Sequence, residues 1–94
     1  MPPLEVEFSP RFRAAARALP KERRQQVAQA TELLREAFGR PHLHGGLGIR
    51  RLQKDYFEFR AGRDTRCIFR LQGGTASMVL VGNHDEVRKF LKNL

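Results

Sequence analysis

The sequence has little cysteine and no long apolar segment. Its one cysteine, Cys67, cannot form an internal disulfide, so nothing in the chain indicates an oxidising compartment. It has no run of about 18 apolar residues and no basic segment followed by an apolar run, the patterns of a membrane helix and an export signal. We therefore expect a cytoplasmic protein without membrane contact. Repeats and low-complexity segments are also absent, so residues 1–94 are expected to form a single domain.

Residues that could hold a metal ion are scarce as well. His42 and His44 lie two positions apart in a loop rich in Gly and Pro, residues 39–48. A structural metal site needs a second pair of Cys or His ligands, and the chain offers none. We expect neither a metal nor a small-molecule cofactor.

Acidic residues are few relative to basic ones, with 18 Lys and Arg against 10 Asp and Glu and a net charge of +8. Fourteen of the basic residues are arginine, whose planar guanidinium matches phosphate oxygens. Residues 39–94 hold eleven basic and five acidic residues, whereas residues 1–38 hold seven and five. The excess after residue 38 predicts a surface that faces a polyanion, either nucleic acid or an acidic protein.

The first half of the chain has the pattern of one strand and two helices. Apolar and acidic residues alternate over residues 4–8, which predicts a strand. Ser9 offers an N-cap and Pro10 suits the first helical position, so a short helix is expected to about Leu19. Pro20 opens a second helix, which Gly39 and Pro41 end. Its apolar residues at helical spacing are Val27, Ala30, Leu34 and Phe38.

The second half has the pattern of four strands and a helix. The strands are expected at residues 49–53, 56–61, 65–72 and 76–81, with turns at Lys54-Asp55 and Gly73-Gly74. Asn83 caps the last helix in a capping-box pattern, and its apolar stripe is Val87, Phe90, Leu91 and Leu94. The order β-α-α-β-β-β-β-α predicts an α+β fold, an antiparallel sheet with the two N-terminal helices packed on one face and a C-terminal helix.

Strand alternation assigns charged residues to the opposite, open face of this sheet. Phe57 and Phe59 should face the two helices, as should Cys67, Phe69 and Leu71. The residues left for the open face are Glu58, Arg60, Arg66, Ile68 and Arg70. Clustered arginines favour an anion, so this face is a candidate anion site. The alternative is a solvated sheet face on which Glu58 pairs with an arginine.

His84 follows the last apolar strand and opens the last helix. A helix N-terminus beside a sheet edge is a favoured position for a phosphate or a reacting group. Histidine can also both accept and donate a proton near neutral pH. The alternative is that His84 only begins a helix and faces water.

Several segments resemble the RelE/ParE toxin superfamily. They are YFEFR at Tyr56–Arg60, RDTRCIFR at residues 63–70 and LVGNHDEV at residues 80–87. Arg51-Leu52 and Leu19-Pro20-Lys21-Glu22, which precedes an amphipathic helix, add to the likeness, which spans nearly the whole chain. The resemblance implies a microbial-RNase-like, RelE-like fold over residues 1–94. It also implies the toxin of a type II toxin–antitoxin system.

Many toxins of this kind are mRNA interferases that inhibit translation by cutting mRNA on the ribosome without metal. The ribose 2′-OH attacks the adjacent phosphate, basic residues stabilise the phosphorane and a second group protonates the leaving 5′-oxygen. By position, Arg66 matches the arginine of the third strand and Arg60 a basic residue of the second. His84 matches the histidine before the last helix in the branch that carries one. The chemistry needs a group that titrates near neutral pH and fixed cations near the phosphate.

Two positions depart from the family pattern. Glu58 replaces a second lysine of the founding ribonuclease, and a glutamate there is an alternative base. Arg88 replaces an aromatic residue that often lies one turn into the last helix, which weakens base stacking. A ParE-like inhibitor of DNA gyrase without nuclease activity, and a degenerate toxin that only binds its antitoxin, therefore remain as alternatives.

The resemblance and the charge pattern together give a set of expected site residues and partners. The expected catalytic residues are His84, Arg66, Arg60 and Glu58. The expected RNA-binding residues are Arg50, Arg51, Lys54, Arg63, Arg70 and Arg88. The expected partners are the ribosome with its mRNA and a cognate antitoxin with an acidic, partly disordered segment.

Overall fold

The computed structural model describes residues 4–40 and 46–94, so His42 and His44 lie outside the described residues. The predicted order of strands and helices is confirmed. The elements are β1 (Glu5–Phe8), α1 (Pro10–Arg17), α2 (Lys21–Ala37), β2 (Arg50–Arg51), β3 (Tyr56–Arg60), β4 (Arg66–Gln72), β5 (Thr75–Gly82) and α3 (His84–Lys92).

The five strands form one sheet in the order β1-β5-β4-β3-β2. The neighbours among β2 to β5 are antiparallel, as predicted, and the α+β class is confirmed. At the edge, however, β1 runs parallel to β5, with Glu5 opposite Thr75 and Phe8 opposite Met78. Parallel neighbours need a long connection between them, and the whole chain from α1 to β4 provides it here.

The α1–α2 hairpin begins with the predicted cap. Ser9 Oγ accepts a hydrogen bond from the Phe12 amide at 3.0 Å, and Pro10 occupies the first turn. α1 ends at Arg17, two residues before the predicted end. α2 buries the predicted apolar residues Val27, Ala30 and Leu34, which confirms that this helix faces the sheet.

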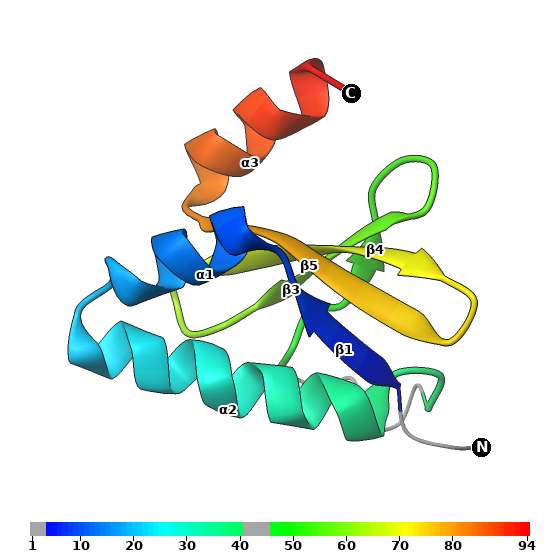
Figure 1. Cartoon of the computed structure of the whole chain (residues 1–94), viewed down its shortest axis with the longest axis horizontal. Helices are drawn as coiled ribbons and strands as arrows, with labels where there is room; N and C mark the ends of the chain where they lie inside the picture. Colours follow the sequence, from blue (N-terminus) through cyan, green and yellow to red (C-terminus); the bar gives the residue numbers. More distant parts are fainter. Residues whose placement is uncertain (1–3, 41–45) are drawn as a thin grey trace.

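α1 and α2 lie on one side of the sheet and α3 on the other (Figure 1). The main core lies between the sheet and the α1–α2 hairpin, and it contains Phe59, Phe69 and Cys67 at 0% exposure. Phe57 stacks on Phe69 with ring centroids 5.4 Å apart. The predicted assignment of these side chains to the helix-facing side is therefore confirmed.

The opposite face is less open than predicted. Ile68 is fully buried with Leu80 and Val87 in a second apolar cluster, against which Phe90 and Leu91 pack. Glu58 is only 2% exposed. The prediction of an open face is therefore wrong for Ile68, which the apolar stripe of the amphipathic α3 covers. It is also wrong for Glu58, which is buried beside Arg50 and Arg66.

The strand predicted at residues 49–53 is reduced to Arg50–Arg51. The chain already turns after Arg51, where the Leu52 amide donates to the Tyr56 carbonyl at 2.9 Å. Lys54 has a positive φ of 55° in this turn. The short edge strand therefore presents Arg50 opposite Glu58 and leaves the rest of the segment to the turn.

No helix within residues 4–40 and 46–94 has both the length and the apolar character that a bilayer span requires.

Candidate anion site at one end of the sheet

Arg60 and Arg66 lie directly opposite each other on β3 and β4. On the other side of β4, Arg66 is opposite Gly82, the last residue of β5. His84 follows two residues later as the first residue of α3. The register therefore brings three of the four predicted catalytic residues to the end of the sheet from which α3 starts.

The first turn of α3 is fixed by a capping box. The Glu86 amide donates to Asn83 Oδ1 at 2.9 Å, and the Asn83 amide donates to Glu86 Oε1 at 3.1 Å. Gly82 makes room for this turn, because a Cβ there would lie 2.9 Å from Glu86 Cδ. His84 is exposed and lies two residues after Gly82, the residue that pairs with Arg66.

The connection between β3 and β4 is equally constrained. Gly62 has φ +87°, and a Cβ on it would lie 2.5 Å from Gln26 Oε1 of α2. The Ala61 amide donates to the Thr65 carbonyl at 2.9 Å and closes the turn. This turn carries Arg63 and sets the pairing of Arg60 with Arg66.

The register pairs two cationic residues, Arg60 and Arg66, and the Arg60 side chain extends to Gly48, where a Cβ would lie 2.8 Å from Arg60 Nε. Two cations directly opposite on neighbouring strands repel, which favours an anion between them. Arg60 forms no ion pair with a carboxylate of residues 4–40 or 46–94, while Arg66 is bound to Glu58. A bound phosphate would relieve this repulsion.

Glu58 lies two residues before Arg60 on β3, opposite Arg50 on one side and Ile68 on the other. Its Oε1 accepts hydrogen bonds from Arg50 Nε at 2.6 Å and Arg66 Nη1 at 3.2 Å. Its Oε2 is buried and has no hydrogen-bond partner among the described residues. Glu58 is thus paired with arginine, as the alternative prediction states. It has two arginine partners instead of one, and it is buried and not solvated.

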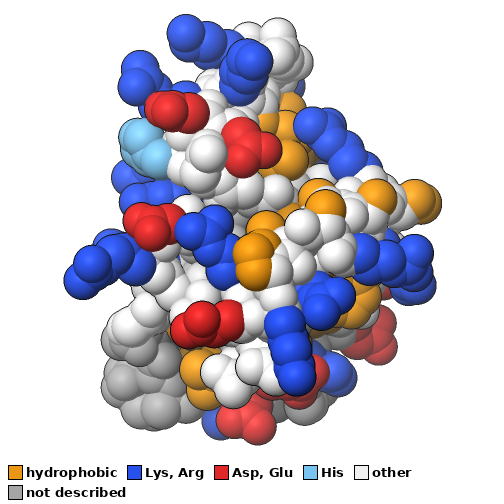
Figure 2. Space-filling view, turned by 90° about the vertical axis from the view of Figure 1, so that its left-hand side faces the viewer, with side chains coloured by type: hydrophobic (Ala, Val, Ile, Leu, Met, Phe, Trp, Pro, Cys, Tyr) orange, Lys and Arg blue, Asp and Glu red, His pale blue; other side chains and the backbone are white. Residues whose placement is uncertain are grey.

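Basic side chains prevail on the side of the molecule that contains this end of the sheet. Figure 2 views the molecule from the left-hand side of Figure 1 and shows Lys and Arg side chains distributed over this surface, with fewer acidic ones between them. The potential here favours an anionic partner.

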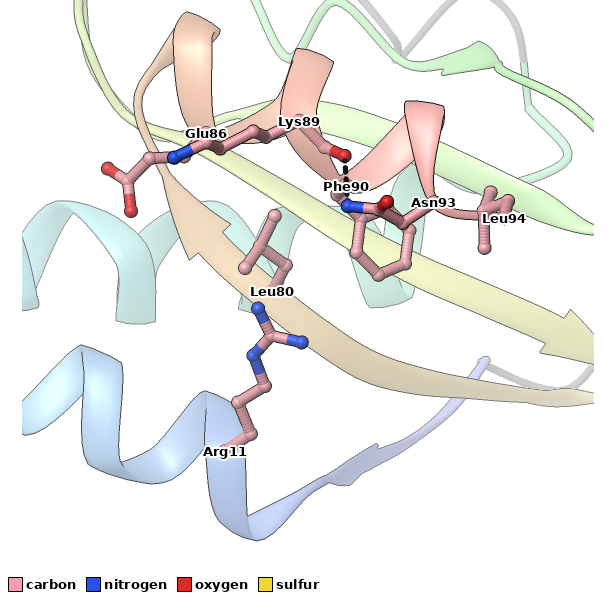
Figure 3. Close-up of a pocket in the computed structure, with 7 residues that line it drawn as sticks. All are labelled: Arg11, Leu80, Glu86, Lys89, Phe90, Asn93 and Leu94. Carbon is pink, nitrogen blue, oxygen red and sulfur yellow. Dashed lines mark hydrogen bonds between the residues drawn. The ribbon is translucent and has the colours of Figure 1, made fainter.

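A groove between α1 and α3 was not predicted from the sequence. Its volume is about 420 Å³, with Leu80 and Phe90 among its lining residues and Arg11 of α1 across from Lys89 of α3 (Figure 3). No local sequence pattern sets the separation of two helices from opposite ends of the chain. Only the three-dimensional arrangement reveals this groove.

No protein-family model and no curated protein matches the sequence. Solved structures, in contrast, are clearly similar. One is a chain of the toxin–antitoxin complex RelBE2 from Mycobacterium tuberculosis, with TM-score 0.69 and 18% identity over 87% of this chain and 99% of that chain. Another is from the RelB–RelE antitoxin–toxin complex of Methanococcus jannaschii, with TM-score 0.68 and 18% identity over 90% and 98%.

A third similar structure is the YoeB/ParE toxin from Agrobacterium tumefaciens, with TM-score 0.61 and 17% identity over 86% of this chain and 99% of that chain. The chain has the fold of the RelE-type toxins. In these three comparisons the similarity covers 86–90% of this chain and 98–99% of the other chain.

Within this RelE-type fold, the predicted RNA-binding residues separate into groups. Arg50 binds Glu58, Arg63 lies in the β3–β4 turn, and Arg88 is exposed on α3 one turn after His84. Arg51, Lys54 and Arg70 belong to the other end of β3 and β4. Only the first three lie near the candidate anion site.

At that other end, the basic side chains have local partners. Arg70 Nε donates to both carboxylate oxygens of Asp55, at 3.1 and 3.0 Å, and its guanidinium lies 5.7 Å from the centre of the Tyr56 ring. Arg51 Nε donates to the Lys54 carbonyl at 2.8 Å. These contacts stabilise the β2–β3 turn and leave fewer donors for RNA.

Cys67 is not a nucleophile in this RelE-type fold. Its side chain is fully buried in the main core, and burial raises the pKa of the Cys67 thiol to about 12. Among the residues that the structure describes, no group of three His, Cys, Asp or Glu side chains is placed to hold a metal ion.

Proposed function

We propose that this chain is the toxin of a type II toxin–antitoxin pair and a metal-independent endoribonuclease that cuts mRNA on the ribosome in the cytoplasm. The observation that carries the proposal is the juxtaposition of Arg60, Arg66 and His84 at one end of a RelE-type sheet. It supplies two cations for a phosphate and an exposed group for proton transfer. The solved structures of similar fold, which include RelB–RelE complexes, support the same function.

In the proposed reaction, the ribose 2′-oxygen attacks the adjacent phosphorus and the bond from phosphorus to the 5′-oxygen breaks. A base takes the 2′-OH proton, and an acid gives a proton to the departing 5′-oxygen. Arg60 and Arg66 hold the phosphate and offset the charge that develops on the phosphorane. His84 is the general acid or base, because it is exposed and begins α3 beside the end of β5.

The test is single-turnover cleavage of mRNA on purified ribosomes. His84→Ala should slow cleavage by about 10²–10⁴-fold, the typical contribution of a general acid–base group, with little change in ribosome binding. His42→Ala and His44→Ala are the matched imidazole controls and should have small effects. Full cleavage by His84→Ala, together with loss of cleavage in Glu58→Gln, would transfer the role to Glu58.

RNA contacts should also give the binding a strong salt dependence. Phosphate contacts release counterions, so affinity for ribosomes should fall steadily as salt is raised. Primer extension on mRNA after induced expression would locate the cuts. Binding that does not respond to salt would instead indicate a protein target.

We further propose that the cognate antitoxin binds along the α1–α2 hairpin. An open groove of about 560 Å³ lies there, with an apolar floor that includes Phe8, Phe12 and Val27 and a basic rim of Arg13, Arg17 and Arg24. Phe8 is 39% exposed, which is unusual for a phenylalanine. An acidic segment with an apolar face, disordered when free, complements such a groove.

Co-purification with the product of the neighbouring reading frame tests this interface. Arg24→Glu should weaken the complex at least about tenfold, because a like charge then faces the acidic segment. Arg23→Glu is the matched control, since Arg23 is the preceding residue of α2 and does not line the groove. Equal affinity of both variants, or separate elution of the two wild-type proteins at micromolar concentration, would contradict the proposal.

The second candidate function is a ParE-like inhibitor of DNA gyrase that cuts nothing. It is favoured by Arg88 at the position of the family aromatic and by Phe90, whose ring packs on Tyr56 at 5.5 Å and is not free to stack on a base. Growth arrest with intact mRNA and stalled gyrase complexes would select this function. Arrest with neither effect, but with antitoxin binding, would indicate a degenerate toxin.

A further inference from the structure

We infer that Glu58 is a positioning residue for Arg66 and not a base that meets the substrate. The inference rests on the proposed nuclease function, in which Arg66 holds the scissile phosphate. The observation behind it is the Arg50–Glu58–Arg66 cluster, in which one carboxylate oxygen accepts from both arginines.

Burial separates Glu58 from any substrate. The Glu58 side chain is 3% exposed, while the side chains of Arg66 and Arg50 are 26% and 62% exposed. A general base must come within hydrogen-bond distance of the proton that it removes. A substrate that approaches this cluster therefore meets the arginines first, and the carboxylate lies behind them.

The two hydrogen bonds to Glu58 are unequal. Arg50 Nε donates at 2.6 Å, whereas Arg66 Nη1 donates at 3.2 Å, at the long end of the range for such bonds. Arg50 is thus the tight partner and anchors the carboxylate. Arg66 is fixed through a single nitrogen, and its other donors are left for an anion.

The charge of the cluster is consistent with this division of roles. Two guanidinium groups and one carboxylate carry a net charge of +1, so Glu58 does not cancel the attraction for phosphate. It also reduces the repulsion between Arg66 and Arg60, which lie opposite each other. Without the carboxylate, Arg66 would lose the one polar partner that the described residues give its side chain.

A double-mutant cycle distinguishes positioning from base catalysis. Single-turnover cleavage on ribosomes is measured for wild type, Glu58→Gln, Arg66→Ala and the double variant. A positioning residue acts through Arg66, so Glu58→Gln should slow wild type about tenfold or more but change the Arg66→Ala variant by less than about twofold. A base would keep a loss of about 10²–10⁴-fold in both backgrounds.

The matched control is Asp55→Asn, the same carboxylate-to-amide change at the exposed Asp55–Arg70 pair. Its effect should add to that of Arg66→Ala, because the two sites share no contact partner. If Glu58→Gln does not fold, as judged by circular dichroism, the cycle is repeated with Glu58→Asp. This variant keeps the charge but draws the carboxylate back from Arg66.

A spectroscopic measurement tests the arrangement without any activity. In a ¹H–¹⁵N spectrum, the guanidinium protons of Arg50 and Arg66 should exchange slowly in wild type and merge with the bulk arginine signals in Glu58→Gln. Unchanged Arg66 signals, or a cycle in which the two effects add, would overturn the role of Glu58 while wild-type cleavage upholds the proposed function. A wild-type protein that leaves mRNA intact would overturn the proposed function itself.

Discussion

The two faces of the sheet are built from alternate residues of the same strands and differ in almost every physical respect. The face under α1 and α2 buries phenylalanines, Cys67 and small apolar residues, and none of its core members is charged. The face under α3 has a smaller apolar cluster around Ile68 and, beside it, a buried carboxylate with two arginines. One residue step along β4, from Arg66 to Cys67, crosses from one environment to the other.

The comparison indicates how a chain of 94 residues can be stable and still present a charged site. Small domains have little apolar area to bury, and a charged patch within the main core would be costly. Alternation confines the charges to one face, while the other face provides most of the hydrophobic stabilisation. Substitutions on the two faces should therefore have different consequences.

The largest effect on stability is expected on the apolar face. Phe69→Ala should lower the free energy of unfolding by about 3–5 kcal/mol, because Phe69 is fully buried and its ring packs on Phe57 and Phe38. For a small domain this loss approaches the whole stability. Urea denaturation measures it, and a midpoint close to that of wild type would contradict the assignment of faces.

On the charged face, loss of activity should exceed loss of stability. Arg66→Ala should reduce cleavage by about 10²–10³-fold, the usual effect of removing one donor to a developing charge, and should relieve toxicity. The fold should persist, because Arg50 still neutralises Glu58. Growth arrest by a soluble, folded Arg66→Ala protein would exclude this site.

Cys67 gives the apolar face a dependence on pH. Its folded-state pKa is raised to about 12 from 9.0, so the thiol stays neutral in the fold while the unfolded chain ionises above pH about 9. The resulting stabilisation is present below that pH and is lost as pH rises toward 12. Between pH 9 and about 10.5, wild type should lose about 1–2 kcal/mol more than Cys67→Ala. Parallel stability curves for the two proteins would indicate an accessible thiol.

The smallest effects on stability are expected at the two helix caps, one on each face of the sheet. Asn83→Ala and Ser9→Ala should each cost about 1 kcal/mol, because each removes the acceptor for an unpaired amide. Asn83→Ala should also slow cleavage, since the capping box of α3 fixes His84. Ser9→Ala, which loosens α1 on the apolar face, should leave the cleavage rate unchanged. Equal cleavage rates for Asn83→Ala and Ser9→Ala would show that the position of α3 does not affect the cleavage reaction.

Local pattern predicted much of this structure. The alternation in β3 and β4 identified both faces correctly, because a side-chain period of two is a property of the backbone. Ser9 and Asn83 identified the starts of α1 and α3 for similarly local reasons. The Lys54-Asp55 turn is likewise a local pattern, and its Asp55 accepts a hydrogen bond from Arg70.

The structural features that the sequence did not predict depend on long-range packing. The burial of Ile68 depends on where α3 lies, and the parallel placement of β1 depends on which edge of the sheet is free. The cluster around Glu58 depends on the pairing of β2 with β3 and of β3 with β4 together. The pairing register of neighbouring strands therefore could not be predicted from the sequence of each strand alone.

The parallel pair of β1 and β5 has a consequence for synthesis of the chain. β1 is among the first described residues to leave the ribosome, but its pairing partner, residues 75–82, is made only after β2, β3 and β4. Contacts between segments so distant in sequence form late, because the loop between them must close first. Until residues 75–82 have been made, Val6 and Phe8 have no strand to pair with, and α1 has no β5 to cover. Since α3 is made after β5, a nascent chain holds no completed Arg60–Arg66–His84 arrangement until β5 and the start of α3 have both been made.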